Sequence, residues 1–459
     1  MSQEIDFLAV QQVFKRFVSQ PGSYLCLSFP NSALDYWCTR ARYFLHPSSL
    51  LMSLSLCMIV KNEANQLPRC LESVRSAVDE IVVVDTGSTD QTVAIAHSFG
   101  AAIYSFAWTG DFSAARNESL THATSDWILV LDADEVLVTE TVSLLKQAIQ
   151  QPDYLVINLL RHEIGAVQSP YSLVSRLFRR HSAIQFSRPY HAMIDDSVIA
   201  LRQREPHWQV VDLTETAILH YGYEPGAIAS RDKLQTARTT MEAYLANHPN
   251  DPYECSKLGA LYVQLGDFER GINLLKHGLT SVERISGGAN SPSSQVTAPV
   301  VYELHYHLGT AYSRLKQADL AAQHYHQAIK QPIVERLKLG AYNNLGSLMK
   351  VNGDLNGAKF AYETCVAIAP EFALGHYNLG TTIRALGNIT DAIVHYQTAL
   401  RLNPDHAEAH QNLGVALLKL GRVEESLASF GRAIALHSHH NPQQAEHLRR
   451  SLKEMGFQL

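Results

Sequence analysis

Short apolar runs alternate with amphipathic stretches over the first half of the chain. The apolar runs predict β-strands, and the stretches between them have the spacing of surface helices. An order of strand, helix, strand, helix is typical of an α/β fold with a mostly parallel sheet and helices on both faces. The predicted strands cover residues 54–60, 81–85, 102–106, 127–132 and 154–159, and the predicted helices cover 67–77, 92–99, 113–123 and 139–149.

The second half carries a different pattern, which repeats every 34 residues. The repeat is marked by Leu345-Gly346, Leu379-Gly380 and Leu413-Gly414. Small residues let paired helices approach closely, aromatic side chains fill the space between helices, and proline ends a helix. The pattern is similar to the tetratricopeptide repeat (TPR) and predicts an all-α solenoid. Its later positions are Tyr362, Tyr396 and Phe430, then Cys365, Ala399 and Ala433, then Pro370 and Pro404.

Two earlier copies of the repeat bring the predicted number to five. They contain Leu308-Gly309 and Leu258-Gly259, and between them residues 281–299 are rich in Ser and Gly and predict an inserted loop. The repeats would cover 251–440, after a helical connector at 226–250 and before a helical tail at 441–459. Stacked repeats form a concave surface that usually holds a peptide or a protein, so we expect a protein partner there. A purely structural tail is the alternative.

Composition and charge narrow the class of protein. The chain has 459 residues, enough for two or three domains, and a formal net charge of −6, which argues against a nucleic-acid partner. Its six cysteines include no CxxC pair, as expected of a reduced, cytoplasmic protein without a structural zinc site. We recognise no signal peptide, and the longest apolar stretch, 50–60, is too short to span a bilayer.

Residues 1–51 precede the first predicted strand and form an extension of unknown role. The extension is either an accessory element or an over-extended start of the chain. Its apolar residues could form one face of a short helix that binds a membrane surface, or a helix that docks on its own domain. These residues are Phe7, Leu8, Val10, Phe14, Phe17 and Val18.

Polar residues follow three of the predicted strands. Lys61, Asn62 and Glu63 follow the first strand, residues 85–90 (DTGSTD) follow the second, and residues 132–135 (DADE) follow the fourth. In a parallel sheet, ligands bind beyond the carboxyl ends of the strands. Two carboxylates separated by one residue suit a hard divalent cation, which readily bridges phosphates. An Asp-x-Asp triplet alone is weak evidence, because such acids also cap helices.

Four segments together resemble the family 2 glycosyltransferases of the GT-A fold. They are residues 57–64 (CMIVKNEA), 79–90 (DEIVVVDTGSTD), 108–117 (WTGDFSAARN) and 126–135 (DWILVLDADE). The last two are similar to the subgroup that contains lipopolysaccharide-core glucosyltransferases and peptide S-glycosyltransferases. The resemblance runs from about residue 52 to 223 and implies a GT-A domain over 52–225.

The resemblance implies a nucleotide-sugar donor, with a UDP-sugar expected, and a bound Mn²⁺ or Mg²⁺. Asp134 would be the principal metal ligand, and Asp132 would lie near both the metal and the ribose. His220 lies where related transferases place a late metal-binding histidine, and imidazole suits Mn²⁺. A lone histidine is about as often structural, so both roles remain open for His220.

The donor pocket implied by the resemblance involves further residues. Asp85 would contact the uracil or the ribose of the donor. Arg116 and Asn117 would lie at the donor pocket, and Glu63 follows the first strand beside it.

The catalytic base is not identified by the sequence. Inverting transfer requires a group that deprotonates the acceptor. The resemblance implies a histidine followed by glutamate in this region, whereas the chain has His191-Ala192. His191, Asp195 and Asp196 are therefore alternative candidates.

Two functions from different classes follow. The first is an inverting, metal-dependent glycosyltransferase whose TPR repeats help to position a protein or glycan acceptor. The second is a TPR scaffold whose transferase-like domain binds a nucleotide sugar without turnover, as the departure at Ala192 would allow. A sugar nucleotidyltransferase is disfavoured, because the Gly- and Arg-rich loop of that class is missing after the first strand.

Overall fold

The computed structural model describes residues 51–222, 231–286 and 294–457. Residues 1–50 lie outside the described residues, so the structure does not test the expectations for the extension and its apolar face. The first residues of the predicted connector lie outside them as well. None of the described helices is both long and apolar enough to cross a membrane.

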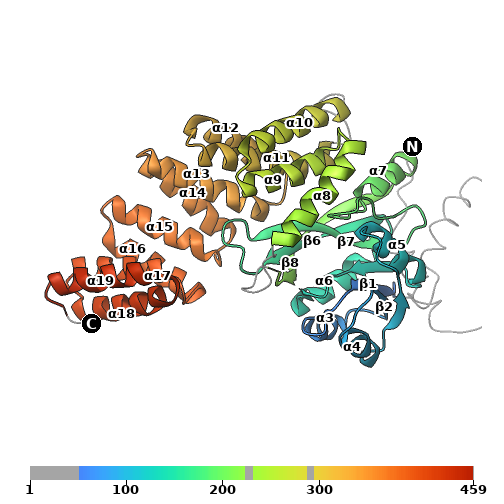
Figure 1. Cartoon of the computed structure of the whole chain (residues 1–459), viewed down its shortest axis with the longest axis horizontal. Coiled ribbons are helices and arrows are strands. Elements are labelled where there is room, and N and C mark those ends of the chain that lie inside the picture. Colours follow the sequence, from blue (N-terminus) through green and yellow to red (C-terminus); the bar gives the residue numbers. More distant parts are fainter. Residues whose placement is uncertain (1–50, 223–230, 287–293, 458–459) are drawn as a thin grey trace, which may run out of the picture. The chain divides into compact units, whose positions relative to one another are not determined.

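The first half forms one eight-stranded sheet in the order β3-β2-β1-β4-β7-β6-β8-β5 (Figure 1). Pairing is parallel among β1, β2, β3 and β4 and between β6 and β8, and antiparallel for the other pairs. The predicted α/β fold with a mostly parallel sheet is confirmed. The strands are β1 (Leu54–Val60), β2 (Glu80–Asp85), β3 (Ala102–Ser105), β4 (Trp127–Val130), β5 (Glu135–Leu137), β6 (Tyr154–Glu163), β7 (Tyr171–Arg179) and β8 (Gln209–His220).

Helices cover both faces of the sheet, because the central strands are apolar on both sides. Strand β1 is buried along almost its whole length. Its Leu56 belongs to the core on one face, and its Cys57 belongs to the core on the other. Helices α3 (Leu67–Val74), α4 (Thr92–Ser98) and α6 (Val142–Ala148, after a 3₁₀ turn at Thr139–Thr141) pack on the first face, and α5 (Phe112–His122) and α7 (Asp195–Arg204) pack on the second.

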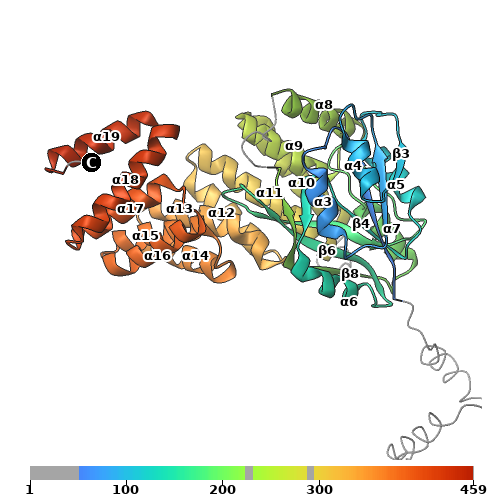
Figure 2. The same ribbon diagram turned by 90° about the horizontal axis from the view of Figure 1, so that it is seen from below.

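The second half is a run of antiparallel helix pairs that follow one another along the chain (Figures 1 and 2). Each predicted Leu-Gly pair lies in the first helix of a pair. The run begins with α8 (Arg231–Asn247), and its pairs are α9 (Pro252–Leu265) with α10 (Phe268–Ser286), α11 (Ser294–Arg314) with α12 (Ala318–Ile329), α13 (Leu339–Val351) with α14 (Leu355–Ile368), α15 (Ala373–Ala385) with α16 (Ile389–Leu402), and α17 (Ala407–Lys419) with α18 (Val423–His440). Helix α19 (Pro442–Glu454) follows the last pair, and a 3₁₀ turn, η2 (Glu335–Lys338), precedes α13.

The glycine of the Leu-Gly pair sets the distance between the two helices of a repeat. A Cβ atom added at Gly380 would lie 3.0 Å from the ring of Tyr396, and one added at Gly414 would lie 2.9 Å from the ring of Phe430. The aromatic side chain therefore packs on bare backbone, which explains why the glycine and the aromatic residue recur together.

The loop predicted over 281–299 is shorter in the structure. Helix α10 continues to Ser286, and α11 begins at Ser294 and contains Pro299. The Ser- and Gly-rich composition obscured the helical spacing of Ser281 and Val282, whose side chains are buried. Proline lacks one backbone donor, but packing in the solenoid outweighs the loss of that single bond.

The solenoid contacts the sheet domain first through the loop before α7. Arg188 Nη1 lies 2.6 Å from Asp196 Oδ2, and its Nη2 lies 2.8 Å from Asp251 Oδ2, at the start of α9. Tyr190 packs against the apolar cluster between α8 and α9, which includes Met241. One buried guanidinium thus joins the two halves.

A second contact is made by the hairpin of β6 and β7, which reaches the third repeat (Figure 2). Leu160 and Tyr171 share an apolar cluster with Leu339 and Phe372. The Tyr171 hydroxyl donates to Glu371 Oε1 at 2.6 Å. The first three repeats are therefore fixed to the sheet domain.

Two histidine pairs occupy equivalent positions in the second and fourth repeats. Nδ1 of His305 lies 2.9 Å from Nδ1 of His324, and Nδ1 of His376 lies 3.1 Å from Nδ1 of His395. Nitrogen atoms this close share one proton, so the two rings of a pair cannot both be protonated at Nδ1. Burial lowers the pKa of His305 to about 4 and lowers the pKa of the other three rings.

We expect the melting temperature to fall as the pH is lowered from 7.5 to 5. Unfolded histidines bind protons near pH 6.5, whereas the folded pairs do so only at lower pH. The unfolded state therefore binds more protons below pH 6.5, and each proton costs about 1.4 kcal/mol of stability per pH unit. Thermal unfolding of a His305→Gln, His376→Gln double variant should show a smaller pH dependence. An unchanged dependence would exclude the pairs as its cause.

Candidate active site

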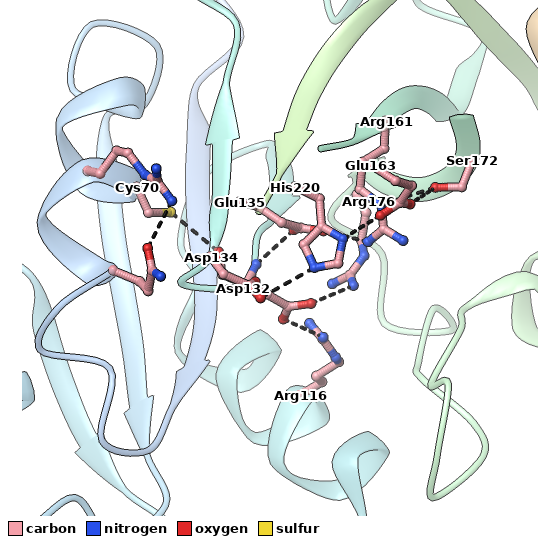
Figure 3. A network of polar contacts seen from close by, with 12 residues as sticks. Cys70, Arg116, Asp132, Asp134, Glu135, Arg161, Glu163, Ser172, Arg176 and His220 are labelled. Carbon is pink, nitrogen blue, oxygen red and sulfur yellow. Dashed lines mark hydrogen bonds and ion pairs between the residues drawn. The ribbon is translucent and has the colours of Figure 1, made fainter. Parts of the chain in front are cut away.

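The carboxylate of Asp132 lies between two arginines just after β4 (Figure 3). Arg116 Nη2 on α5 donates to Oδ1 at 2.6 Å, and Arg176 Nη2 on β7 donates to Oδ2 at 3.0 Å. Burial alone would raise the pKa of Asp132, but the two guanidinium groups hold it well below its usual range. Asp132 is therefore ionised, and the structure brings it together with Arg116.

Asp134 and His220 face each other because β5 pairs with β8. The register places Glu135 opposite His220, and the imidazole Nε2 lies 3.3 Å from Asp134 Oδ2 (Figure 3). The other ring nitrogen, Nδ1, contacts Glu163. Burial lowers the pKa of His220, but the hydrogen bonds to Asp134 and Glu163 outweigh this effect and raise it to about 9.

Arg161 on β6 holds the carboxylates beneath these residues. Its Nη1 donates to Glu135 Oε1 at 2.6 Å, and its Nε donates to Glu163 Oε1 at 2.8 Å. Glu135 is fully buried, and its other oxygen accepts the backbone N–H of Asp132 at 2.9 Å. Burial raises the pKa of Glu163, yet bonds from His220 and Arg161 lower it to about 2. Arg161 thus fixes both the Asp132 backbone and the imidazole of His220.

Asp85 and Glu63 end neighbouring strands at the same edge of the sheet, but no described contact joins them to Asp132. The Asp85 carboxylate accepts the backbone N–H groups of Gly87 and Ser88 and so shapes the loop after β2. The carbonyl of Glu63 accepts the N–H of Leu67 at the start of α3. Their predicted roles in donor binding stay predictions.

The side-chain amide of Asn117 is held by the backbone of Phe186. Its amide donates to the Phe186 carbonyl at 2.9 Å and accepts the Phe186 N–H at 2.7 Å. Both polar atoms of the amide therefore fix the loop before α7. Its predicted place at the donor pocket stays a prediction, and the structure gives Asn117 a bracing role.

The three base candidates lie together at the start of α7, in different environments. Asp196 is held by Arg188 and by the Ser187 hydroxyl, so its oxygens are occupied. His191 has a left-handed backbone conformation, φ 52°, and an exposed side chain. Asp195 receives one side-chain hydrogen bond, from Ser175 Oγ at 3.3 Å. Burial raises the pKa of Asp195 to about 6, although the bond from Ser175 lowers it.

A β-bulge in β7 contains the two adjacent residues that contact Asp195 and Asp132. Strand β7 carries an extra residue where it passes Ile157 and Leu159, at Ser175 and Arg176. Bulges re-aim side chains, and these two neighbours reach Asp195 and Asp132 respectively. Ser175, which contacts Asp195, is therefore the direct chain neighbour of Arg176, which contacts Asp132.

Sequence reasoning missed three residues of the network, Arg161, Glu163 and Arg176. Arg161 and Glu163 lie on a strand that was predicted to end at residue 159. The run from Leu159 to Glu163 carries charged residues at the end of an apolar strand, which is the same signal that identified Asp132. That signal could have found them.

The residues fit a divalent cation in part. A histidine that holds a metal usually has its other nitrogen bonded to a carboxylate, as Glu163 does for His220. Asp134 supplies an oxygen that lies 3.3 Å from Nε2, the second nitrogen of that ring. Asp132 is instead engaged by two arginines, and among the described residues no three His, Cys, Asp or Glu side chains form a ready metal site. Asp134 and His220 are the residues that fit as ligands of a divalent cation.

Gly222 packs against the imidazole of His220, a role that no motif in the sequence indicates. An added Cβ would lie 2.6 Å from Nε2 and 3.3 Å from Asp134 Oδ2. We expect Gly222→Ala to displace the ring and to lower nucleotide release from a sugar donor at least about tenfold, or about 1.4 kcal/mol. Gly431→Ala is the matched control, because no atom lies within 4 Å of its added Cβ. Equal rates for both variants would refute this role of Gly222.

Comparisons with known proteins classify both halves of the chain. Residues 55–211 match the family described as glycosyl transferase family 2. Tetratricopeptide repeat families match 303–332, 339–372, 382–421 and 407–440. The chain therefore carries a family 2 glycosyltransferase domain followed by TPR repeats, as the sequence predicts.

The chain is also similar to particular proteins and to a solved structure. A TPR repeat-containing protein of Synechococcus elongatus is 44% identical, over 70% of this chain and 76% of that protein, and the chain belongs to its family. The SPbeta prophage-derived glycosyltransferase SunS of Bacillus subtilis is 27% identical, over 50% of this chain and 54% of SunS. The solved structure of YrrB, a TPR protein with an unusual peptide-binding site, is 16% identical with a TM-score of 0.35 and covers 47% of this chain and 100% of YrrB.

Proposed function

We propose that the chain is an inverting, metal-dependent glycosyltransferase that moves a sugar from a nucleotide donor, with a UDP-sugar expected, to an acceptor. The observation that carries the proposal is the network of Asp132, Asp134 and His220 at the carboxyl edge of the sheet of a family 2 domain. Asp134 and His220 would hold Mn²⁺ or Mg²⁺. When bound, the ion supplies positive charge to the departing diphosphate.

The protein's own residues supply the remaining functions. Arg116 and Arg176 hold the Asp132 carboxylate in place and leave positive charge near the donor phosphates. Asp195 is the best base among the three candidates, because no cation of the described residues forms an ion pair with its carboxylate and its raised pKa favours proton acceptance near neutral pH. Asp196 is occupied by Arg188, so it is the weaker candidate.

The repeats would position a protein or glycan acceptor. Because the first and third repeats contact the sheet domain, the acceptor-holding surface has a defined relation to the transfer site. The four buried thiols found among the described residues suit a cytoplasmic protein, the compartment that we propose.

The test is nucleotide release from a panel of UDP- and GDP-sugars with Mn²⁺, compared with the same reactions in EDTA. The proposal predicts release from at least one donor in Mn²⁺ and none in EDTA. Donor binding without release, even with acceptor mixtures, would instead favour a TPR scaffold with an inactive domain. An absence of donor binding would refute the donor site.

A further inference from the structure

A series of contacts leads from α7 of the transferase domain to α9 of the first repeat. Asp196, the neighbour of Asp195, contacts Arg188 at 2.6 Å. The guanidinium carbon of Arg188 lies 5.2 Å from the centre of the Tyr253 ring on α9. The proposed base is thus next to residues that belong to the TPR solenoid.

The series continues to an ion pair between the first two repeats. Lys257 Nζ lies 5.0 Å from the centre of the Tyr253 ring and bonds both oxygens of Glu303 on α11 at 2.7 Å. The side chain of Lys257 is 23% exposed, and that of Glu303 is 30% exposed. Solvent reaches the pair, so a bound molecule can reach it as well.

The ion pair lies within electrostatic reach of the transferase residues. Partial desolvation lowers the pKa of His191, whose side chain stays exposed, and the charges of Lys257 and Arg161 act in the same direction. Arg161 also acts on the pKa of Lys257. Charges influence each other in this way only over short distances. The charge of Lys257 therefore acts on His191 of the transferase domain as well as on Glu303.

The repeat fold does not require this ion pair. Lys257 directly precedes a Leu-Gly pair, and Asn378 and Asn412 occupy the same position in the fourth and fifth repeats. A lysine occurs there in the first repeat, which contacts the transferase domain. The placement of the charge therefore follows the transferase site rather than the repeat pattern.

We propose that α9 and α11 form the acceptor side of the transfer site, where the Lys257–Glu303 pair hydrogen-bonds a hydroxyl-bearing acceptor beside Asp195. This inference rests on the proposed function. In the step, Asp195 takes the hydroxyl proton while the acceptor oxygen bonds to the anomeric carbon. The bond from that carbon to the donor phosphate breaks, and the nucleoside diphosphate leaves with the electron pair.

A tethered hydroxyl tests the inference without knowledge of the natural acceptor. Lys257→Cys, made in a chain with Cys26→Ser and Cys38→Ser, is treated with 2-hydroxyethyl methanethiosulfonate. The resulting side chain is one atom longer than lysine and ends in a hydroxyl, and the four described cysteines are buried. The matched control is Asn412→Cys, the equivalent position in the fifth repeat. Each protein is incubated with Mn²⁺ and a UDP-sugar that the wild type hydrolyses. The mass of the intact protein is then measured by mass spectrometry.

We expect one sugar on the tether at position 257, none at position 412, and none at 257 when Asp195→Asn is added. Donor hydrolysis without sugar at position 257 would overturn the inference and leave the proposed function intact. Equal labelling at 257 and 412 would overturn it too. A wild type that releases no nucleotide from any donor would refute the proposed function itself, and the inference with it.

Discussion

Asp134→Asn is expected to lower nucleotide release from a sugar donor at least about a hundredfold, or about 2.7 kcal/mol. The carboxylate of Asp134 lies 3.3 Å from Nε2 of His220, whose other nitrogen is held by Glu163. An amide keeps the shape of the side chain but removes its charge, and charge stabilisation of a leaving group is a large catalytic effect. Release is measured by chromatography of the free nucleotide at saturating Mn²⁺.

The control for this variant is Asp319→Asn, which changes an exposed acid in the first turn of α12. Surface substitutions of this kind change stability by about 0.5 kcal/mol or less, and we expect the wild-type rate. The assignment of Asp134 would fail if both variants released nucleotide at the wild-type rate. Equal loss in both would point to damage unrelated to the site.

Asp195→Asn is expected to lower donor turnover about a hundredfold to ten-thousandfold, the usual contribution of a positioned base. Wild-type turnover should also fall as the pH drops through about 6, because burial raises the pKa of Asp195 to that value and only its ionised form accepts a proton. The groups that face it are Ser175, Asp196, Arg188 and Tyr253, and none of these neutralises it by an ion pair. The measurement is the pH dependence of kcat/KM for donor hydrolysis between pH 4.5 and 8.

The neighbouring acid, Asp196, provides the control for the Asp195→Asn variant. Asp196→Asn weakens the contact with Arg188, and we expect it to lower the melting temperature while the fall in rate near pH 6 persists. Asp195→Asn should lose that fall. If the fall near pH 6 remained in Asp195→Asn and vanished in Asp196→Asn, the two assignments would be reversed.

Much of the fold and the acidic part of the site follow from local sequence. The apolar strand that precedes Asp132 and Asp134 can be recognised in the sequence. A buried strand requires apolar residues, whereas the exposed end of that strand requires polar ones. The carboxyl ends of parallel strands meet at one edge, so the place of these acids could be predicted as well. The spacing of Leu-Gly pairs likewise predicts the solenoid, since Gly380 must meet Tyr396.

The remaining features of the site depend on contacts between residues that are far apart in the chain. Such contacts cannot be recognised in a single sequence. Arg161 contacts Glu135, 26 residues away, because β6 and β5 both pair with β8. The difference between Asp195 and Asp196 is also hidden, since the two residues are chemically identical. It arises from Arg188, whose left-handed backbone conformation, φ 74°, accompanies its bonds to Asp196 and Asp251.

The most direct test of the account is the course of donor turnover, followed by proton NMR with a UDP-sugar and Mn²⁺. An inverting transfer predicts that the first sugar released has the anomeric configuration opposite to that of the donor, because the proposed base, Asp195, would activate the incoming oxygen on the face away from the diphosphate. The spectrum must be recorded before the free sugar interconverts between its anomers. Release of a sugar with retained configuration, or no release from a donor that binds, would contradict the account.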